Sequence, residues 1–174
     1  MSDALPEIPA EVRDWIGEER YREVSEFPVE QGYIWTACAS VEMGNPLFWD
    51  EKVANELTDG PIAPPTMIST WFRPHHWAPG RIVQALPLQI HFDLKEVLEL
   101  PEAIMSDYTV TFGEPVRPGD RLRTAQILRT LSDPKTTKLG TGRFWLIDVV
   151  YTNQNDEYVG TESYTGFGYR RNAA

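Results

Sequence analysis

The chain has 174 residues, 41% of them hydrophobic and 11% aromatic, and a formal net charge of −10 at pH 7. This acidity argues against binding to nucleic acid or to an anionic membrane, because both attract basic proteins. No stretch approaches the roughly 20 apolar residues that cross a membrane, and the acidic N-terminus lacks the order of a signal peptide. The single Cys38 excludes an internal disulfide or a zinc cluster of cysteines. We therefore expect one cytoplasmic domain over residues 1–174, without a metal.

The first half of the chain predicts short helices around one strand. Residues 1–18 contain Pro6 and Pro9 and are expected to form an extended or helical lead-in. Asp50 is suited to cap a helix that Asp59-Gly60 closes, since a short polar side chain can accept the first free N–H groups. The expected elements are a helical turn at Val12–Ile16, a strand at Tyr21–Phe27, and helices at Tyr33–Val41 and Asp50–Leu57.

A further helix is expected where Pro64-Pro65-Thr66 precedes the apolar run "MISTWF". Proline is tolerated in the first turn of a helix and disfavoured inside one, so Pro74 should end it. Roughly eight or nine residues then remain, which at the rise of an α-helix make a segment about 13 Å long.

The second half of the chain predicts strands joined by turns such as "EPVRPGDRL" and "NQNDE". Short turns imply an antiparallel meander, and helices followed by a sheet indicate an α+β fold in which a curled sheet surrounds one central helix. Such a sheet leaves an edge strand that invites pairing with another chain. The expected strands are Gln89–Leu94, Asp107–Phe112, Arg121–Ser132, Arg143–Thr152 and Tyr158–Tyr169.

Four stretches, in this order, carry a resemblance to a known family: "GNPLFWDEKVA", "GPIAPPTM", "EPVRPGDRL" and "KLGTGRFWLIDVVYTNQNDEYV". Over about residues 21–169 the chain resembles the MaoC-like dehydratase and (R)-specific enoyl-CoA hydratase family, in particular its divergent N-terminal-domain branch. The resemblance implies a single hotdog domain, in which a curled antiparallel sheet wraps around a short central helix. It also implies dimers that join their sheets edge to edge.

Active members of that family hydrate trans-2-enoyl thioesters of coenzyme A, or catalyse the reverse dehydration. They place an Asp two residues before an Asn-Pro pair and a His two residues after it, and these groups hold a water and transfer protons. A His-Gly pair at the start of the central helix supplies a backbone N–H to the enolate oxygen. Here, around Asn45-Pro46, the corresponding positions hold Met43, Phe48 and Pro64-Pro65. These side chains transfer no protons and proline has no N–H, so no catalytic residue is expected.

Two other groups are candidates for catalysis. His75 and His76, beside Trp77, either replace the lost catalyst or belong to a loop at the mouth of the pocket. Asp50 and Glu51 either provide a thioesterase carboxylate, or Asp50 only caps its helix.

Basic and aromatic side chains are candidates for binding an acyl-CoA. Arg and Lys are the usual partners of phosphate, so the cations of the turns either meet the phosphates of coenzyme A or are solvated. Aromatic residues of the central helix either line an acyl channel or belong to the core. The candidate binding residues are Asn45, Thr66, Met67, Trp71, Phe72, His75, Trp77, Lys138 and Arg143, together with the cations Arg117, Arg121 and Lys135.

The resemblance leaves two functional predictions open. In the first, the chain is the non-catalytic, pocket-forming subunit of a heteromeric enoyl-CoA hydratase or dehydratase, and a MaoC-like partner supplies the Asp/His pair. In the second, it is a stand-alone acyl-CoA binding protein, or a thioesterase using other residues, and it can pair with itself. Neither needs a cofactor, because coenzyme A arrives as part of the substrate. A central helix of only about 13 Å leaves a wide crevice, which favours bulky acyl groups such as steroid side-chain-like thioesters.

Overall fold

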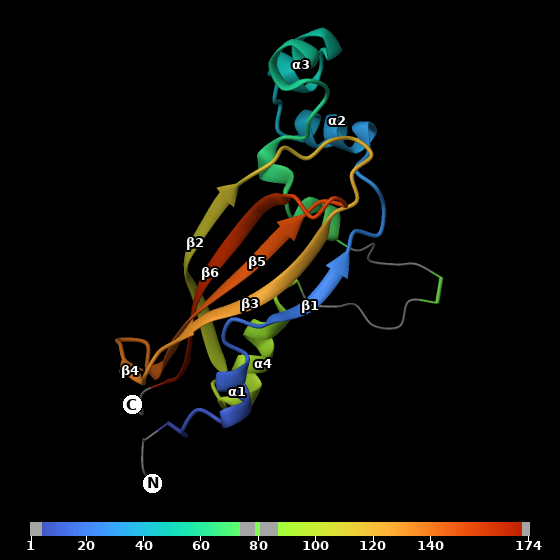
Figure 1. Cartoon of the computed structure of the whole chain (residues 1–174). Coiled ribbons are helices and arrows are strands. Elements are labelled where there is room, and N and C mark those ends of the chain that lie inside the picture. The colour runs from blue at the N-terminus through green and yellow to red at the C-terminus, as the bar shows by residue number, and fades with distance from the viewer. Residues whose placement is uncertain (1–4, 74–78, 81–86, 172–174) are drawn as a thin grey trace.

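The structure, a computed structural model, describes residues 5–73, 79–80 and 87–171 (Figure 1). No helix in these ranges is long and apolar enough to cross a membrane. The helices are α1 (Ala10–Asp14), α2 (Gln31–Ser40), α3 (Glu51–Thr58) and α4 (Gln89–Val97), with short 3₁₀ helices η1 (Pro46–Phe48), η2 (Pro65–Met67) and η3 (Thr70–Phe72). The strands are β1 (Glu19–Val24), β2 (Glu102–Phe112), β3 (Arg123–Leu131), β4 (Lys135–Thr136), β5 (Thr141–Thr152) and β6 (Tyr158–Arg170).

The strands form one antiparallel sheet in the order β1-β3-β5-β6-β2, with the short β4 paired to β5. The prediction of an antiparallel meander is confirmed, since β3, β5 and β6 follow one another in the sheet as they do in the chain. The strand expected at Tyr21–Phe27 is β1, which begins two residues earlier, at Glu19. The four later strands expected from Asp107 onward are β2, β3, β5 and β6. β1 and β2 therefore form the two edges of the sheet.

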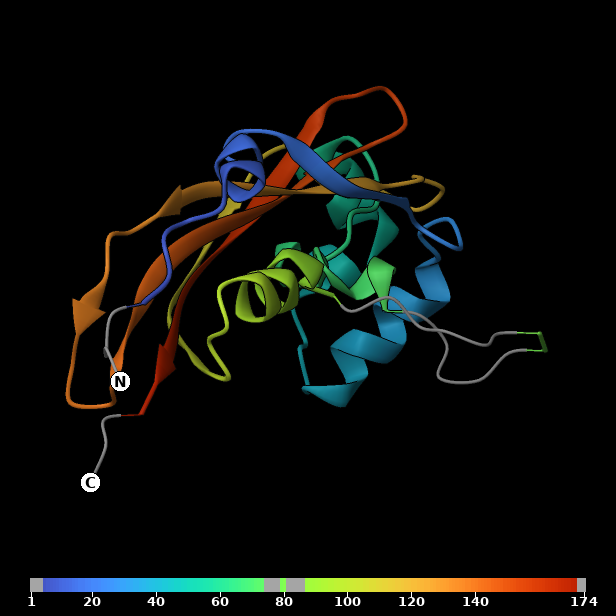
Figure 2. The ribbon, with the colours of Figure 1, turned by 90° about the horizontal axis from the view of Figure 1, so that it is seen from below.

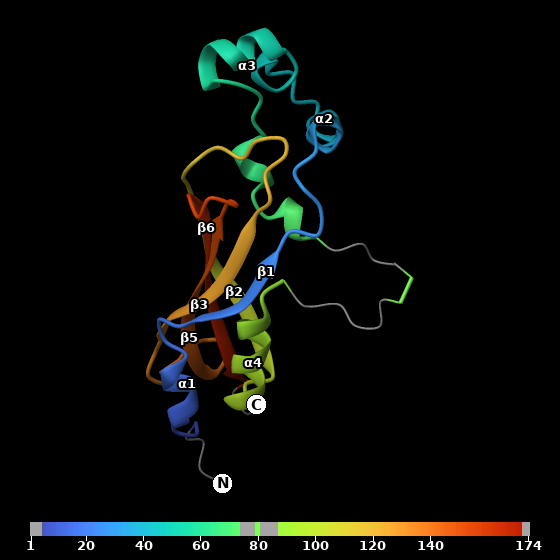
Figure 3. The same ribbon diagram turned by 45° about the vertical axis from the view of Figure 1, so that its right-hand side comes forward.

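The sheet is curled, and its concave face packs against helical elements. Figure 2 shows the sheet curving over α4. Figure 3 shows α4 beside the lower half of the sheet, with α2 and α3 beyond its upper end. One apolar cluster includes Met67, Trp71 and Tyr151, and joins η2 and η3 to the sheet. A second includes Leu94 and Trp145, and joins α4 to the sheet.

The short N-terminal helices agree with expectation. The segments expected at Val12–Ile16, Tyr33–Val41 and Asp50–Leu57 are α1, α2 and α3, with ends shifted by one or two residues. The cap predicted at Asp50 is confirmed, because its Oδ1 accepts two backbone N–H groups of the first turn, at 2.9 and 3.4 Å. The helix ends at Asp59, which adopts the left-handed conformation with φ 54°.

The strand expected at Gln89–Leu94 is wrong, because this segment begins helix α4. Apolar residues alternate here at Ile90, Phe92 and Leu94, which is the pattern of a strand. In the structure Ile90 and Leu94 are buried four residues apart on one helical face, whereas Phe92 is 41% exposed. Leu98, which caps the helix and is also buried, continues the same face.

The segment expected as one central helix from Pro64 onward consists instead of η2 and η3. Its hydrogen bonds, such as Met67 N–H to the Pro64 carbonyl, join residues three apart rather than four. Two prolines remove N–H donors, and β-branched residues at 66, 68 and 70 disfavour an α-helix. The helical segment ends at Phe72, before Pro74, as expected. The α-helix in the concavity of the sheet is therefore α4.

Candidate functional site

Two tryptophans hold the loop of Met43 and Phe48, the residues predicted to stand where active members of the family have Asp and His. The indole N–H of Trp49 donates to the Met43 carbonyl at 2.7 Å, and that of Trp35 donates to the Phe48 carbonyl at 3.0 Å. The two indole rings stack, with centroids 6.4 Å apart. The side chain of Asn45 accepts a backbone N–H at 3.0 Å and caps η1. The loop backbone is thus held without the side chains of Met43 and Phe48.

The side chains of Met43 and Phe48 form part of an apolar wall. Both are half-buried and pack against the cluster that contains Met67 and Trp71, and Phe72 packs there too. The structure therefore brings together five of the residues named from the sequence. None of these five side chains can transfer a proton as a carboxylate or an imidazole does.

The start of η2 provides one free backbone donor. Pro64 and Pro65 have no N–H, and the Met67 N–H is engaged by the Pro64 carbonyl at 2.9 Å. Thr66 is exposed, and its N–H has no acceptor among the described residues. The unengaged N–H of this turn is therefore at position 66, and position 65 has none.

A cavity of about 660 Å³ lies between α2 and η3. This size is within the range of roughly 300–1,000 Å³ that is usual for small-molecule sites. Its walls include Phe27, Tyr33 and Trp71, and its charged members are Glu26, Glu30 and Arg73. Tyr33 and Trp71 meet edge to face with centroids 5.6 Å apart. Trp71, a candidate for the acyl channel, thus belongs both to the core and to a cavity wall.

A buried carboxylate on the concave face was not found from the sequence. Glu162 is 3% exposed and accepts hydrogen bonds from the hydroxyls of Tyr108 and Tyr151, each at 2.6 Å, and of Tyr164 at 3.2 Å. Burial and the adjacent carboxylate raise the pKa of Tyr108 to about 12, and also raise the pKa of Tyr151 and of Tyr164. The ring centroids of Phe72 and Tyr151 are 5.5 Å apart. The sequence signal that could have indicated this site is a glutamate in the middle of the apolar strand expected at Tyr158–Tyr169.

The cations expected to bind phosphate do not converge on this site. Arg143 is 5% exposed, and its guanidinium donates to the Ser132 and Pro6 carbonyls at 2.9 and 3.0 Å. This residue therefore ties the N-terminal lead-in to the sheet. Arg117 similarly donates to two carbonyls at the end of α3, at 2.6 and 3.3 Å. Lys138 is exposed in the turn after β4, and β4 lies at the end of the sheet opposite α2 and α3 (Figure 1).

Of the remaining candidates, the structure describes Glu51 and Arg121. His75 and Trp77 lie outside the described residues. Glu51 is exposed at the start of α3 beside the cap Asp50. Arg121, in the loop before β3, is also exposed.

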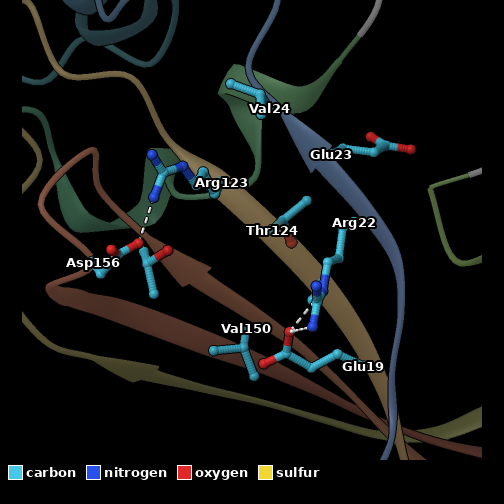
Figure 4. Close-up of a pocket in the computed structure, with 10 residues that line it drawn as sticks. Glu19, Arg22, Glu23, Val24, Arg123, Thr124, Val150 and Asp156 are labelled. Atoms are coloured by element: carbon cyan, nitrogen blue, oxygen red, sulfur yellow. Dashed lines mark hydrogen bonds and ion pairs between the residues drawn. The ribbon is translucent and has the colours of Figure 1, made fainter.

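A groove of about 430 Å³ on the other face of the sheet is built mainly by β1 and β3 (Figure 4). Its two arginines face carboxylates: Arg22 contacts Glu19 at 2.9 Å, and Arg123 contacts Asp156. Val150 also lines the groove, and as the neighbour of Tyr151 on β5 it points to the convex face. The groove therefore lies behind the concave site, and its cations are already paired.

The curled antiparallel sheet, its central helix and the held loop at one end define a protein of the hotdog dehydratase class. The sequence model of the family "FAS1-like, dehydratase domain region" matches residues 14–162, and the chain belongs to that family. The comparison with curated proteins gave no match.

Solved structures of the same fold include two complexes from Mycobacterium tuberculosis. A chain of the ChsH1-ChsH2 complex is 22% identical, with a TM-score of 0.76, over 95% of this chain and 90% of that chain. A chain of the HadBC (3R-hydroxyacyl-ACP dehydratase) complex is 18% identical, with a TM-score of 0.58, over 86% and 93%. The MaoC-like dehydratase from Rhodospirillum rubrum is also 18% identical, with a TM-score of 0.58, over 88% and 93%. The predicted MaoC-like hotdog fold is confirmed.

Proposed function

We propose that this chain is the non-catalytic, pocket-forming subunit of a heteromeric enoyl-CoA hydratase or dehydratase, whose partner carries the Asp/His pair. The observation that carries the proposal is the loop of Met43 and Phe48. Trp35 and Trp49 hold its backbone, while both side chains join an apolar cluster. The loop therefore has a held backbone, and Met43 and Phe48 give it no side chain that transfers protons. The ChsH1-ChsH2 and HadBC complexes, which share the fold, support a partnered role.

The edge strand β2 supports pairing with another subunit. It has eleven residues, contains neither proline nor lysine, and exposes several large apolar side chains. Ile104 is 40% exposed, Met105 44% and Phe112 49%. Monomeric proteins usually protect such an edge with charge, proline or a covering segment, because its free N–H and C=O groups recruit other strands. β2 is therefore the edge that we assign to the partner.

The ligand that we propose is a bulky acyl-CoA. The helical segment that begins at Pro65 is broken into η2 and η3 and ends at Phe72. A crevice beside so short a segment accommodates a polycyclic acyl group better than two full helices would. The test is kcat/KM of the reconstituted complex for crotonyl-CoA and for a polycyclic enoyl-CoA. We expect the polycyclic substrate to be preferred, and preference for crotonyl-CoA would contradict this part of the proposal.

Activity of the isolated chain tests the central claim. We expect no hydration of crotonyl-CoA or of a polycyclic enoyl-CoA by the isolated chain, and turnover once a subunit with the intact Asp/His pair is added. Turnover by the isolated chain that persists in Met43→Ala and Phe48→Ala would show that other residues catalyse the reaction.

Substitution on β2 tests the assigned interface. Ile104→Lys places a charge on the edge and should reduce co-purification with the catalytic subunit. Leu139→Lys is the matched control, because Leu139 is similarly exposed, at 45%, but lies in the turn between β4 and β5. If both variants lost the catalytic subunit equally, or if both kept it, the interface would lie elsewhere.

A stand-alone acyl-CoA binding role is the second candidate. The cavity of about 660 Å³ beside Trp71 favours it, since a pocket of that size lies within this chain alone. Calorimetric titration of the isolated chain with stearoyl-CoA distinguishes the two. Tight binding without a partner, together with a homodimer in sedimentation, would favour the stand-alone role.

A further inference from the structure

The two apolar clusters of the concave face are separate, and polar side chains lie at their boundary. On β5 one cluster ends at Val149 and the other begins at Ile147. On β6 these residues are paired with Glu162 and Tyr164, and Tyr164 is paired in turn with Tyr108 on β2. The polar group therefore crosses the concave face between the part packed under η3 and the part packed under α4.

The carboxylate of Glu162 keeps an open acceptor position. A carboxylate offers about four lone-pair positions to donors. Oε2 accepts the hydroxyls of Tyr151 and Tyr164, whereas Oε1 accepts that of Tyr108 and no other among the described residues. Tyr108 is 50% exposed, unlike Glu162. The open position therefore lies on Oε1, the oxygen that the half-exposed Tyr108 contacts.

The described part of the chain provides nothing else to neutralise this carboxylate. No lysine or arginine pairs with Glu162 there; its three partners are tyrosines. Removing a carboxylate from water is unfavourable, and apolar residues of similar volume often pack as well or better. The pKa of each of the three tyrosines is raised from an ordinary value of 10.0, so their hydroxyls are donors at neutral pH, as those of tyrosine ordinarily are. The arrangement is a buried anion, held in place by donors and able to accept one more.

We infer that Glu162 is the binding site for a hydroxyl group of the ligand, an acyl thioester whose chain or ring system carries that hydroxyl. The hydroxyl donates to Oε1 of Glu162, beside Tyr108. A hydroxyl fits where a carbonyl does not, because the open position is an acceptor and the three phenolic protons are already engaged. Phe72, in contact with Tyr151, places the site next to the end of η3. The inference rests on the proposed acyl-binding function and specifies one feature of the ligand.

Two matched pairs of probes test this inference by calorimetric titration. Lithocholoyl-CoA and 5β-cholanoyl-CoA differ by one ring hydroxyl, and 12-hydroxystearoyl-CoA and stearoyl-CoA differ by one chain hydroxyl. The full chain is used, together with any subunit that co-purifies with it. Hydrogen bonds to charged groups predict that the hydroxylated member of at least one pair binds roughly tenfold tighter or more.

Variants of the cluster separate ligand recognition from a structural role. Glu162→Met removes the acceptor and should bring the affinity ratio of each pair to one. Glu162→Gln, which keeps the shape and provides a second variant if Glu162→Met does not fold, should lower the ratio. Tyr108→Phe frees a further acceptor position on Oε1 and should preserve or increase the affinity ratio. Tyr158→Phe is the control, because Tyr158 is also half-exposed but donates to Thr161.

The outcomes distinguish this inference from the proposed function. Binding of both members of each pair with equal affinity would overturn the hydroxyl site and leave acyl binding intact. A preference that survives both Glu162 variants would overturn the assignment to Glu162. Equal weakening of both probes in the variants would show a structural role only. Failure of all four probes to bind would overturn the acyl-binding function, and this inference with it.

Discussion

The loop of Met43 and Phe48 predicts that hydratase activity can be restored in part. Met43→Asp with Phe48→His places a carboxylate and an imidazole on a backbone that Trp49 and Trp35 hold at 2.7 and 3.0 Å. These bonds involve carbonyls rather than the replaced side chains, so the loop should keep its shape. We expect the double variant to hydrate crotonyl-CoA at a measurable rate.

The double variant should remain slow, because position 65 still lacks a donor for the enolate oxygen. Removal of one such donor typically lowers the rate by a factor of ~10²–10³. The Met67 N–H cannot replace it, since the Pro64 carbonyl engages it at 2.9 Å. Pro65→Gly supplies the missing N–H, and the triple variant should exceed the double variant by about that factor.

Steady-state hydration of crotonyl-CoA, followed by loss of the enoyl absorbance, measures these rates. Pro61→Gly in the double-variant background is the control, because replacing a proline by glycine can lower stability by about 0.4–1 kcal/mol through the unfolded chain alone. Equal rates for the double and triple variants would mean that the Thr66 N–H already acts as the donor. An inactive but folded triple variant would refute the placement of catalysis at Met43 and Phe48.

Three further predictions concern stability. Burial lowers the pKa of His91, so below pH ~6.5 the unfolded chain binds a proton more readily than the folded chain does. The free energy of unfolding, measured in urea, should therefore fall as the pH falls below ~6.5, and His91→Leu should make that fall smaller. A Cβ on Gly166 would overlap the indole nitrogen of the buried Trp145, so Gly166→Ala should cost about 1–3 kcal/mol in urea unfolding, whereas Gly32→Ala, which meets nothing within 4 Å, should not. Asp50→Ala should lower the free energy of unfolding by about 1 kcal/mol, and with it the melting temperature, whereas Asp50→Asn should keep most of the stability because Asn also caps helices.

The sheet was predictable because its turns are local signals. Residues 113–122, 133–142 and 153–157 carry the glycine, proline, asparagine and aspartate of turns, and the segments between them have lengths typical of strands. The order of the strands in the sheet was harder to predict from the sequence. β2 follows α4 in the chain and yet lies beyond β6, and that placement depends on contacts between residues far apart in sequence.

The helical segments show where periodicity fails. Six residues from Gln89 fit an alternating pattern as well as a helical one, and only packing of Ile90 and Leu94 under the sheet separates the two. After Pro64 the apolar run was long enough for a helix, but local composition selected two 3₁₀ turns. Both errors concern the elements that cover the concave face, where tertiary contacts decide the outcome.

The site was predictable only where it depends on the order of motifs along the chain. Met43, Phe48 and Met67 come together because the loop and η2 join one cluster. Arg143 was named for its charge, yet it is buried and bonded to the carbonyls of Ser132 and Pro6. Glu162 was not named, because its tyrosine donors come from three strands and meet only through register.

The two tryptophans link the absence of proton-transfer groups to the proposed partner. Trp35 and Trp49 are 43% and 44% exposed, and each still commits its indole N–H to the loop. Under the proposed function, a loop held in this way without a catalytic side chain is held for its shape. That shape is the apolar wall that Met43 and Phe48 present to the acyl group while the partner transfers the protons. Apolar residues at these two positions and a firmly held backbone are then two consequences of one division of labour.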